Sequence, residues 1–106
     1  RVLERNIASL DAAARCAVHV VDAHRFLAGL AAATGGGASG GESRARYGVA
    51  FADPPYRTDD AERVARAWLA GPFAAVLGIE HEAPRQLPAG GDARRYGDTG
   101  ITLYRE

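Results

Sequence analysis

Apolar residues recur along this chain at two different spacings, and the spacing predicts where helices and strands lie. Residues 3–14 and residues 22–30 carry apolar side chains three or four positions apart, which indicates amphipathic helices. Residues 17–21 are short and β-branched, which is typical of a strand. Residues 47–52 form a nearly continuous apolar run, as in a strand that is buried on both faces of a parallel sheet.

A third helix is predicted after Asp59, which stands in the position of a helix cap. Glu62 follows three residues later, at the capping-box position, and Gly71-Pro72 is expected to end the helix. The spacing assigns five residues to the buried face of this helix: Ala61, Val64, Ala65, Trp68 and Leu69.

The last third of the chain predicts three strands. Residues 73–79 are an apolar strand, and two alternating runs, 93–96 and 99–104, flank Gly97-Asp98, which favours a β-hairpin. Strands that alternate with helices predict an α/β fold with a mostly parallel, doubly wound sheet. The hairpin adds an antiparallel edge to that sheet.

The length of 106 residues fits one domain or part of one, interrupted by a flexible Gly-rich loop at residues 34–46. Gly35, Gly37 and Gly40 in this loop match the spacing G-x-G-x-x-G. The dinucleotide-binding fingerprint needs a strand before it and a helix after it. Here a predicted helix comes first, so we interpret the glycines as loop residues.

Composition excludes several classes of function. The formal net charge is zero, which predicts no general attraction to nucleic acid or membranes, and no apolar run is long enough to span a bilayer. Cys16 is the single cysteine, so a disulfide within the chain and a multi-cysteine zinc site are excluded; we expect a reduced, buried thiol in a cytoplasmic protein. His19, His24 and His81 are scattered, which predicts no metal site and structural or solvated roles.

The stretch Asp53-Pro54-Pro55-Tyr56 is the strongest candidate for chemistry. It follows the predicted strand 47–52, at the carboxyl end where open α/β sheets place their sites. The two prolines fix the backbone. A rigid carboxylate and a proline carbonyl would accept both N–H bonds of a planar amine, and the aromatic ring would stack on the base that carries it. Such a site works by positioning and needs no nucleophilic side chain.

Asp22 is a second candidate, because it follows the predicted strand 17–21. It is interpreted either as the cap of the next helix or as a ligand-binding acid, and the pattern alone leaves both open.

Four stretches resemble one family. "DPPY" after an apolar strand resembles motif IV of amino-methyltransferases that use S-adenosyl-L-methionine. The ending "RRYGDTGITLYRE" resembles the C-terminal hairpin of the RsmD family, which methylates N2 of a guanine in 16S ribosomal RNA. "LERNIASL" resembles that family's helix after the ribose-binding acid, and "VHVVDAHRFL" resembles its adenine-binding strand and helix.

The resemblance implies a Rossmann-like class I methyltransferase fold and a role for each candidate residue. Asp53 and the Pro54 carbonyl would bind the target amine, and Tyr56 would stack on the guanine. Asp22 with the Ala23 backbone would hold the adenine of S-adenosyl-L-methionine. Two further residues would contact substrate at the mouth of the site: Pro55 and Arg57, the latter meeting RNA phosphate or serving only as surface.

The same resemblance implies that this chain is the C-terminal part of a methyltransferase domain. The family's Gly-rich cofactor loop and first two strands would precede Arg1, and the chain contains no Met. The family's sheet has the order 3-2-1-4-5-7-6, so residues 17–21 would be a third strand without a neighbour. We therefore expect residues 1–106 alone to self-associate, to be partly unfolded, or to pair residues 17–21 with residues 47–52.

Two other functions fit the pattern. An adenine-N6 methyltransferase would use the same motif, although such enzymes more often carry Asn where Asp53 stands. A non-catalytic RNA-binding module would lack the cofactor half. For the favoured function, the expected partners are 16S ribosomal RNA or the small-subunit particle and the N-terminal segment of the same protein, without membrane or metal.

Overall fold

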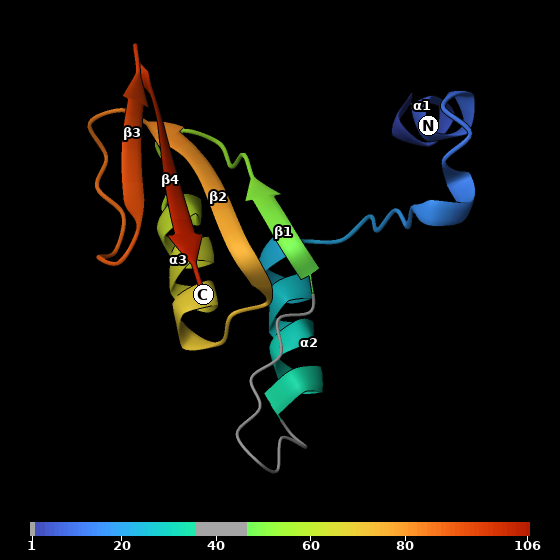
Figure 1. Ribbon diagram of the computed structural model, residues 1–106, viewed down its shortest axis with the longest axis horizontal. Coiled ribbons are helices and arrows are strands. Elements are labelled where there is room, and N and C mark those ends of the chain that lie inside the picture. The colour runs from blue at the N-terminus through green and yellow to red at the C-terminus, as the bar shows by residue number, and fades with distance from the viewer. Residues whose placement is uncertain (1, 36–46) are drawn as a thin grey trace.

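A computed structural model describes residues 2–35 and 47–106 of the chain. Its elements are α1 (Val2–Ser9), the 3-10 helix η1 (Ala13–Arg15), α2 (Ala23–Gly35), β1 (Tyr47–Ala52), α3 (Asp60–Ala70), β2 (Ala74–Glu82), β3 (Asp92–Tyr96) and β4 (Thr99–Arg105). Figure 1 shows the strands side by side with α2 and α3 next to them, while α1 lies apart. The predicted loop 34–46 falls largely outside the described residues, and α2 continues into its first two positions.

The four strands form one mixed sheet with the order β1-β2-β4-β3. β1 pairs with β2 in parallel, whereas β4 pairs with β2 and with β3 in antiparallel fashion. This is the order 4-5-7-6 that the resemblance implies, so the predicted topology of these strands is confirmed. β2 extends three residues beyond its predicted end, because Glu80 and Glu82 pair with Ile101 and Thr99 of β4.

The hydrophobic core lies between α3 and one face of this sheet. Leu77 and Ile79 of β2 point to this face and are 1% and 0% exposed. The predicted buried face of α3 is confirmed for Ala61, Val64, Ala65 and Trp68. Leu69 is an exception, since its side chain is exposed.

Trp68 joins the helix to the sheet through both its ring and its N–H. The indole Nε1 donates a hydrogen bond to the carbonyl oxygen of Ala74, at 2.8 Å, where β2 begins. The indole ring packs against the ring of Tyr104 in β4, with centroids 5.7 Å apart. Because the only polar group of the indole is satisfied, this large side chain is buried without an unpaired donor.

The start of α3 differs from the predicted capping box. Asp59 occupies the cap position, but its side chain makes no capping hydrogen bond. The hydroxyl of Thr58 instead accepts the backbone N–H of Asp60, at 3.3 Å. Glu62 forms an ion pair with Arg85, 23 residues along the chain. A contact that is distant in the sequence therefore replaces the local one.

The predicted strand at residues 17–21 is wrong. Residues 16–21 contain no strand, and Val20 is 88% exposed. A strand needs a neighbour for its backbone N–H and C=O groups, and no described strand lies beside this segment. Its predicted pairing with β1 is likewise not formed. Cys16 in the same segment is exposed rather than buried.

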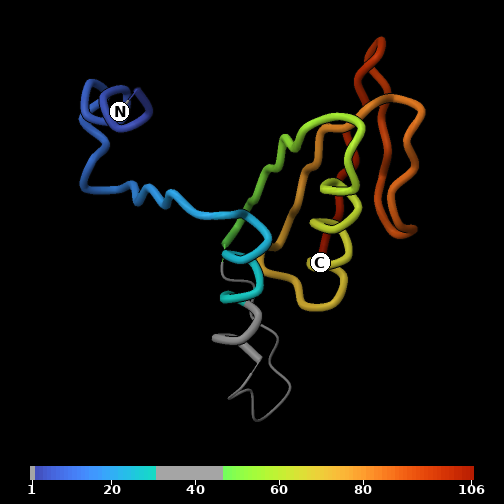
Figure 2. The backbone as a smooth tube through the Cα atoms, turned by 180° about the vertical axis from the view of Figure 1, so that it is seen from behind, coloured from blue at the N-terminus to red at the C-terminus, as the bar shows by residue number. Residues whose placement is uncertain are grey.

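The helix α1 is shorter than the one predicted over residues 3–14, since it ends at Ser9, and it makes no part of the core. None of its residues is buried, and Leu3 is 58% exposed. Figures 1 and 2 show from opposite sides that α1 is separated from the sheet by an extended segment. Its apolar face is therefore left exposed to solvent.

The two edges of the sheet differ in polarity. At the β1 edge, Val49 is 72% exposed and Phe51 is 62% exposed. At the other edge, all five residues of β3 are exposed, and three of them are charged. Charged side chains keep an exposed edge from pairing with another chain. The β1 edge, which carries no such charge, is the one suited to accept a further strand.

We predict that the 106-residue chain self-associates through β1. Val49→Lys should reduce self-association, because a charge on this edge opposes strand pairing. Static light scattering at several concentrations measures the effect. Tyr96→Lys places the same charge on the β3 edge and should leave association unchanged. Equal scattering by the two variants, or a monodisperse wild-type monomer, would contradict the prediction.

Candidate active site

A pocket of about 510 Å³ lies where β1, α2 and α3 meet. β1 ends at this pocket, and α2 and α3 begin there, so carboxylates and helix N-termini surround it. Its apolar wall includes Phe26, Leu27, Phe73 and Leu77. Five of the residues that the sequence singled out line this pocket: Asp22, Ala23, Asp53, Pro54 and Pro55.

Asp53 follows the last residue of β1 and is exposed at the pocket. Its carboxylate makes no hydrogen bond or ion pair with any residue in the described part of the chain. Both oxygens are thus available as acceptors for a ligand. The role of Asp53 as an amine receptor stays a prediction.

Asp22 caps α2, as one of its two interpretations predicted. Its Oδ2 accepts the backbone N–H of Arg25, three residues after Asp22, at 3.0 Å, which is the usual geometry of an N-cap. The same residue lines the pocket beside Ala23. Capping occupies one carboxylate oxygen and leaves the other for a ligand, so the two interpretations are compatible.

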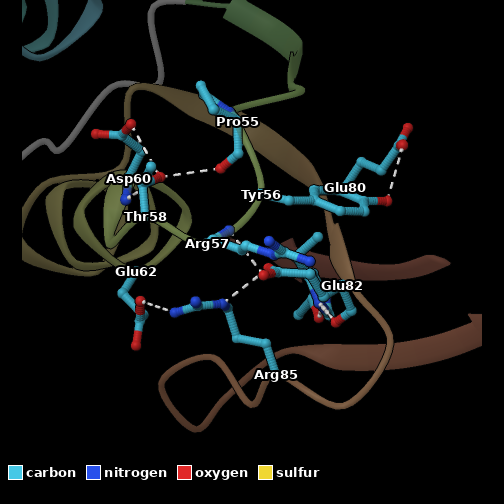
Figure 3. A network of polar contacts seen from close by, with 11 residues as sticks. Pro55, Tyr56, Arg57, Thr58, Asp60, Glu62, Glu80, Glu82 and Arg85 are labelled. Carbon is cyan, nitrogen blue, oxygen red and sulfur yellow. Dashed lines mark hydrogen bonds and ion pairs between the residues drawn. The ribbon is translucent and has the colours of Figure 1, made fainter. Parts of the chain in front are cut away.

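Tyr56 lies outside the pocket lining and points toward the ends of β2 and β4. Its hydroxyl lies 3.2 Å from Oγ1 of Thr99 and 3.4 Å from Oε2 of Glu80. Figure 3 shows the ring beside Glu80. The ring is 40% exposed, which leaves surface for stacking. The sequence did not reveal these two contacts, because Thr99 is 43 residues away.

Arg57 has an unusual backbone conformation. Its φ is +65°, in the left-handed region that costs a residue with a Cβ roughly 1–2 kcal/mol. Its backbone N–H donates to Oε2 of Glu82 at 2.7 Å, which holds this turn. Its guanidinium is exposed and makes no hydrogen bond or ion pair with the residues that the structure describes.

His24 and Asp60 are functional candidates that the sequence did not suggest. His24 Nε2 lies 2.7 Å from Oδ1 of Asp60, and both line the pocket. This contact ties the beginning of α2 to the beginning of α3. The two residues are 36 positions apart, so no local pattern predicts that they meet.

Asp60 at the pocket and Glu82 at the end of β2 are both held in their charged form. Hydrogen bonds from His24 and then Thr58 lower the pKa of Asp60 below its ordinary value of 3.8. The Arg85 guanidinium lowers the pKa of Glu82 below its ordinary value of 4.5, and the N–H of Arg57 contributes to the same shift. Since a bond to the charged form favours that form, both acids stay ionised at neutral pH.

Neither of the other two histidines lines this pocket. His81 is 3% exposed, and its ring nitrogens lie 2.8 Å from Thr102 Oγ1 and 2.8 Å from the carbonyl oxygen of Glu82. A Cβ at Gly100 would come within 2.6 Å of this ring, so glycine is required there. His19 packs on Phe26, with ring centroids 5.0 Å apart. The structural role predicted for His81 is confirmed.

Over residues 2–35 and 47–106, no three His, Cys, Asp or Glu side chains are grouped so as to hold a metal ion. No helix in these ranges has the length and apolar character needed to cross a bilayer.

Known structures with a similar fold include candidate methyltransferases. The candidate methyltransferase yhhF of Escherichia coli has 22% identity and a TM-score of 0.64, over 97% of this chain and 54% of that chain. The candidate methylase HI0767 of Haemophilus influenzae has 18% identity and a TM-score of 0.64, over 98% of this chain and 63% of that chain.

The hypothetical protein TTHA0928 of Thermus thermophilus has 26% identity and a TM-score of 0.70, over all of this chain and 56% of that chain. No protein-family model and no curated protein matches the sequence. The chain therefore has the Rossmann-like fold of these structures and spans between half and two thirds of their length.

We predict that acid weakens the fold through Asp60. A carboxyl whose pKa is lowered in the folded state stabilises that state above its unfolded pKa, and this contribution is lost as the pH falls through the folded pKa. The free energy of unfolding should therefore drop as the pH falls below about 4. Asp60→Asn should make this drop shallower in urea titrations at several pH values.

Asp59→Asn is the matched control for this measurement. Asp59 is the preceding acid, and its carboxylate has no partner among the described residues. Its removal should leave the steepness of the acid transition unchanged. If Asp59→Asn flattened the transition as much as Asp60→Asn, the bond between His24 and Asp60 would not be its cause.

Proposed function

We propose that this chain is the substrate-binding part of an S-adenosyl-L-methionine-dependent enzyme that methylates the exocyclic N2 amine of a guanine in 16S ribosomal RNA. The observation that carries the proposal is one pocket lined by both Asp53 and Asp22. These are the residues that the resemblance to the RsmD family assigns to the target amine and to the cofactor. The similar fold of two candidate methyltransferases supports methyl transfer in general.

The residues at the beginning of α2 are chemically suited to the adenine end of S-adenosyl-L-methionine. The pocket combines an apolar wall, which includes Phe26 and Leu27, with the Asp22 carboxylate and the backbone of Ala23. A planar, amine-bearing base needs an apolar surface and a few acceptors that fix its orientation. When bound, this cofactor supplies an electrophilic methyl group on a sulfonium centre.

The role of the chain's own residues is to present the amine. The Asp53 carboxylate and the Pro54 carbonyl would accept the two N–H bonds of the guanine amine and orient its lone pair. The amine nitrogen would take the methyl group that the cofactor supplies, in exchange for one proton that passes to solvent. Orientation and charge supply the rate enhancement, because no covalent intermediate with the protein is needed.

Tyr56 would serve as the stacking surface for the guanine. Its hydroxyl lies 3.2 Å from Thr99 Oγ1 and 3.4 Å from Glu80 Oε2, which places the ring at the carboxyl ends of β1 and β2. Arg57 carries an exposed positive charge beside it, which suits a phosphate of the RNA backbone. Together they extend the site outward from the pocket, toward the small-subunit particle that we propose as the substrate.

Asp53→Ala tests the chemistry in the full-length product of the gene. Methyl transfer to 16S ribosomal RNA should fall by on the order of 100-fold or more, because the amine loses its acceptor. Cofactor affinity, measured by isothermal titration, should stay near that of the wild type. Asp59→Ala removes another exposed carboxylate six residues later and should leave turnover unchanged. Near-normal turnover by Asp53→Ala would remove the basis for its assignment.

Substitution at Tyr56 separates the ring from the hydroxyl. Tyr56→Ala should weaken RNA binding by about 1–3 kcal/mol through lost stacking. Tyr56→Phe should be mild, because it keeps the ring and loses only long, exposed contacts of the hydroxyl. Binding of a target-site RNA fragment measures both. If the phenylalanine variant were as weak as the alanine variant, the hydroxyl would be the functional group.

Asp22→Asn separates cofactor binding from helix capping. Asparagine caps a helix about as well as aspartate, so thermal stability should change little. Cofactor affinity should fall, because the amide removes the charge that faces the pocket. Isothermal titration with S-adenosyl-L-methionine beside a melting curve measures both quantities. Unchanged affinity would assign Asp22 to capping alone, and failure of the wild type to bind would favour a non-catalytic RNA-binding module.

A further inference from the structure

The loop at residues 53–58, which carries the proposed catalytic Asp53, is held in place by contacts with other parts of the chain. Residues 53–58 contain two prolines and then a left-handed turn at Arg57, with φ +65°. A residue with a Cβ stays in this region only when neighbouring groups enforce it. The direction of this turn determines where Tyr56 and the prolines point, so the contact that enforces the turn also orients the loop.

Glu82 makes the contact that bears on this turn directly. It is the last residue of β2, and its Oε2 accepts the backbone N–H of Arg57 at 2.7 Å. The bond is short, and it joins the carboxyl end of the central strand to the one residue of the loop with a positive φ. The other side-chain contacts of residues 53–58 do not reach the backbone of Arg57. They run through the Tyr56 hydroxyl, from Thr58 Oγ1 to the Pro55 carbonyl at 2.9 Å, and between Thr58 Oγ1 and Asp60 at 3.1 and 3.3 Å.

The carboxylate of Glu82 is itself fixed in orientation. Arg85 donates from Nε to Oε1 of Glu82 at 2.9 Å, and from Nη1 to Oε1 of Glu62 at 2.6 Å. Figure 3 shows Arg85 between the two acids, with Glu82 directed at Arg57. Each oxygen of Glu82 thus has its own donor, and the side chain that holds the loop is anchored to both β2 and α3.

We propose that Glu82, oriented by Arg85, is a positioning residue of the active site: it holds the left-handed turn at Arg57 and so aims the 53–58 loop at the target amine. This inference rests on the proposed function. Glu82 acts through the backbone of Arg57, and no contact with substrate or cofactor is assigned to it. The lowered pKa of its carboxyl agrees with this role, because the ionised form is the better acceptor.

Glu82→Ala in the full-length protein is the first test. Turnover of 16S ribosomal RNA should fall by up to about 100-fold through misplacement of the loop, while affinity for S-adenosyl-L-methionine is unchanged. Amide hydrogen exchange at Arg57 should become faster, since its N–H loses its acceptor. Asp92→Asn is the control, because it removes an exposed carboxylate that pairs with Arg94 at 3.1 Å on β3, and it should change neither quantity.

A pair of double variants distinguishes positioning from a general loss of structure. Glycine adopts a positive φ without assistance, whereas alanine does not. Both Arg57→Gly and Arg57→Ala remove the guanidinium. Combined with Glu82→Ala, the glycine variant should therefore recover at least several-fold more turnover than the alanine variant. Equal turnover in the two double variants would overturn the proposal, as would wild-type turnover and exchange in Glu82→Ala.

A failure of the proposed function can be distinguished from a failure of the positioning role of Glu82. If the wild-type protein methylated no guanine, or if Asp53→Ala kept full activity, the assigned chemistry would be wrong. Exchange at the Arg57 amide requires no turnover and would still decide whether Glu82 holds the loop. Unchanged exchange in Glu82→Ala would show that another contact enforces the turn.

Discussion

The burial of β2 is the constraint on which the rest of this structure depends. β2 is paired on both sides, in parallel with β1 and in antiparallel fashion with β4, and α3 covers one of its faces. Trp68 connects these parts, because its N–H satisfies the carbonyl of Ala74 while its ring fills the space beside Tyr104. Removing that side chain would open a large cavity and leave a buried carbonyl without a donor.

The same pairing creates the site. Because β1 and β2 are parallel, their carboxyl ends meet at one edge of the sheet, where Asp53 follows one strand and Glu82 ends the other. α2 and α3 begin near this edge, so their first residues complete the pocket. A loop with two prolines then needs only a few outside bonds to be rigid. Asp22, Asp53 and Asp60 come from three separate segments and line one pocket, although no short sequence motif contains them all.

Much of the fold could be predicted from the sequence, because local rules decide it. The apolar run of β1, the spacing of Ala61, Val64 and Trp68 in α3, and the turn at Gly97 depend on residues a few positions apart. Asp53 could be selected in the same way, since a strand that stops on an acid and two prolines is a local signal. The strand predicted at residues 17–21 is absent for a physical reason. A β-branched segment forms a strand only where a neighbouring strand accepts its hydrogen bonds.

The sequence by itself therefore determined the elements from β1 onward, most of the buried face of α3 and the place where β1 stops. It did not determine burial in β1, whose apolar run predicted a strand covered on both faces but whose Val49 and Phe51 are exposed. The tertiary structure decided which residues meet: that Asp22 and Asp53 share a pocket, that His24 binds Asp60, and that Tyr56 turns outward to Thr99. It also replaced the predicted role of Glu62 as a capping residue by an ion pair with Arg85. Contacts between residues tens of positions apart depend on how the helices pack on the sheet, and no periodicity within a single element encodes that packing.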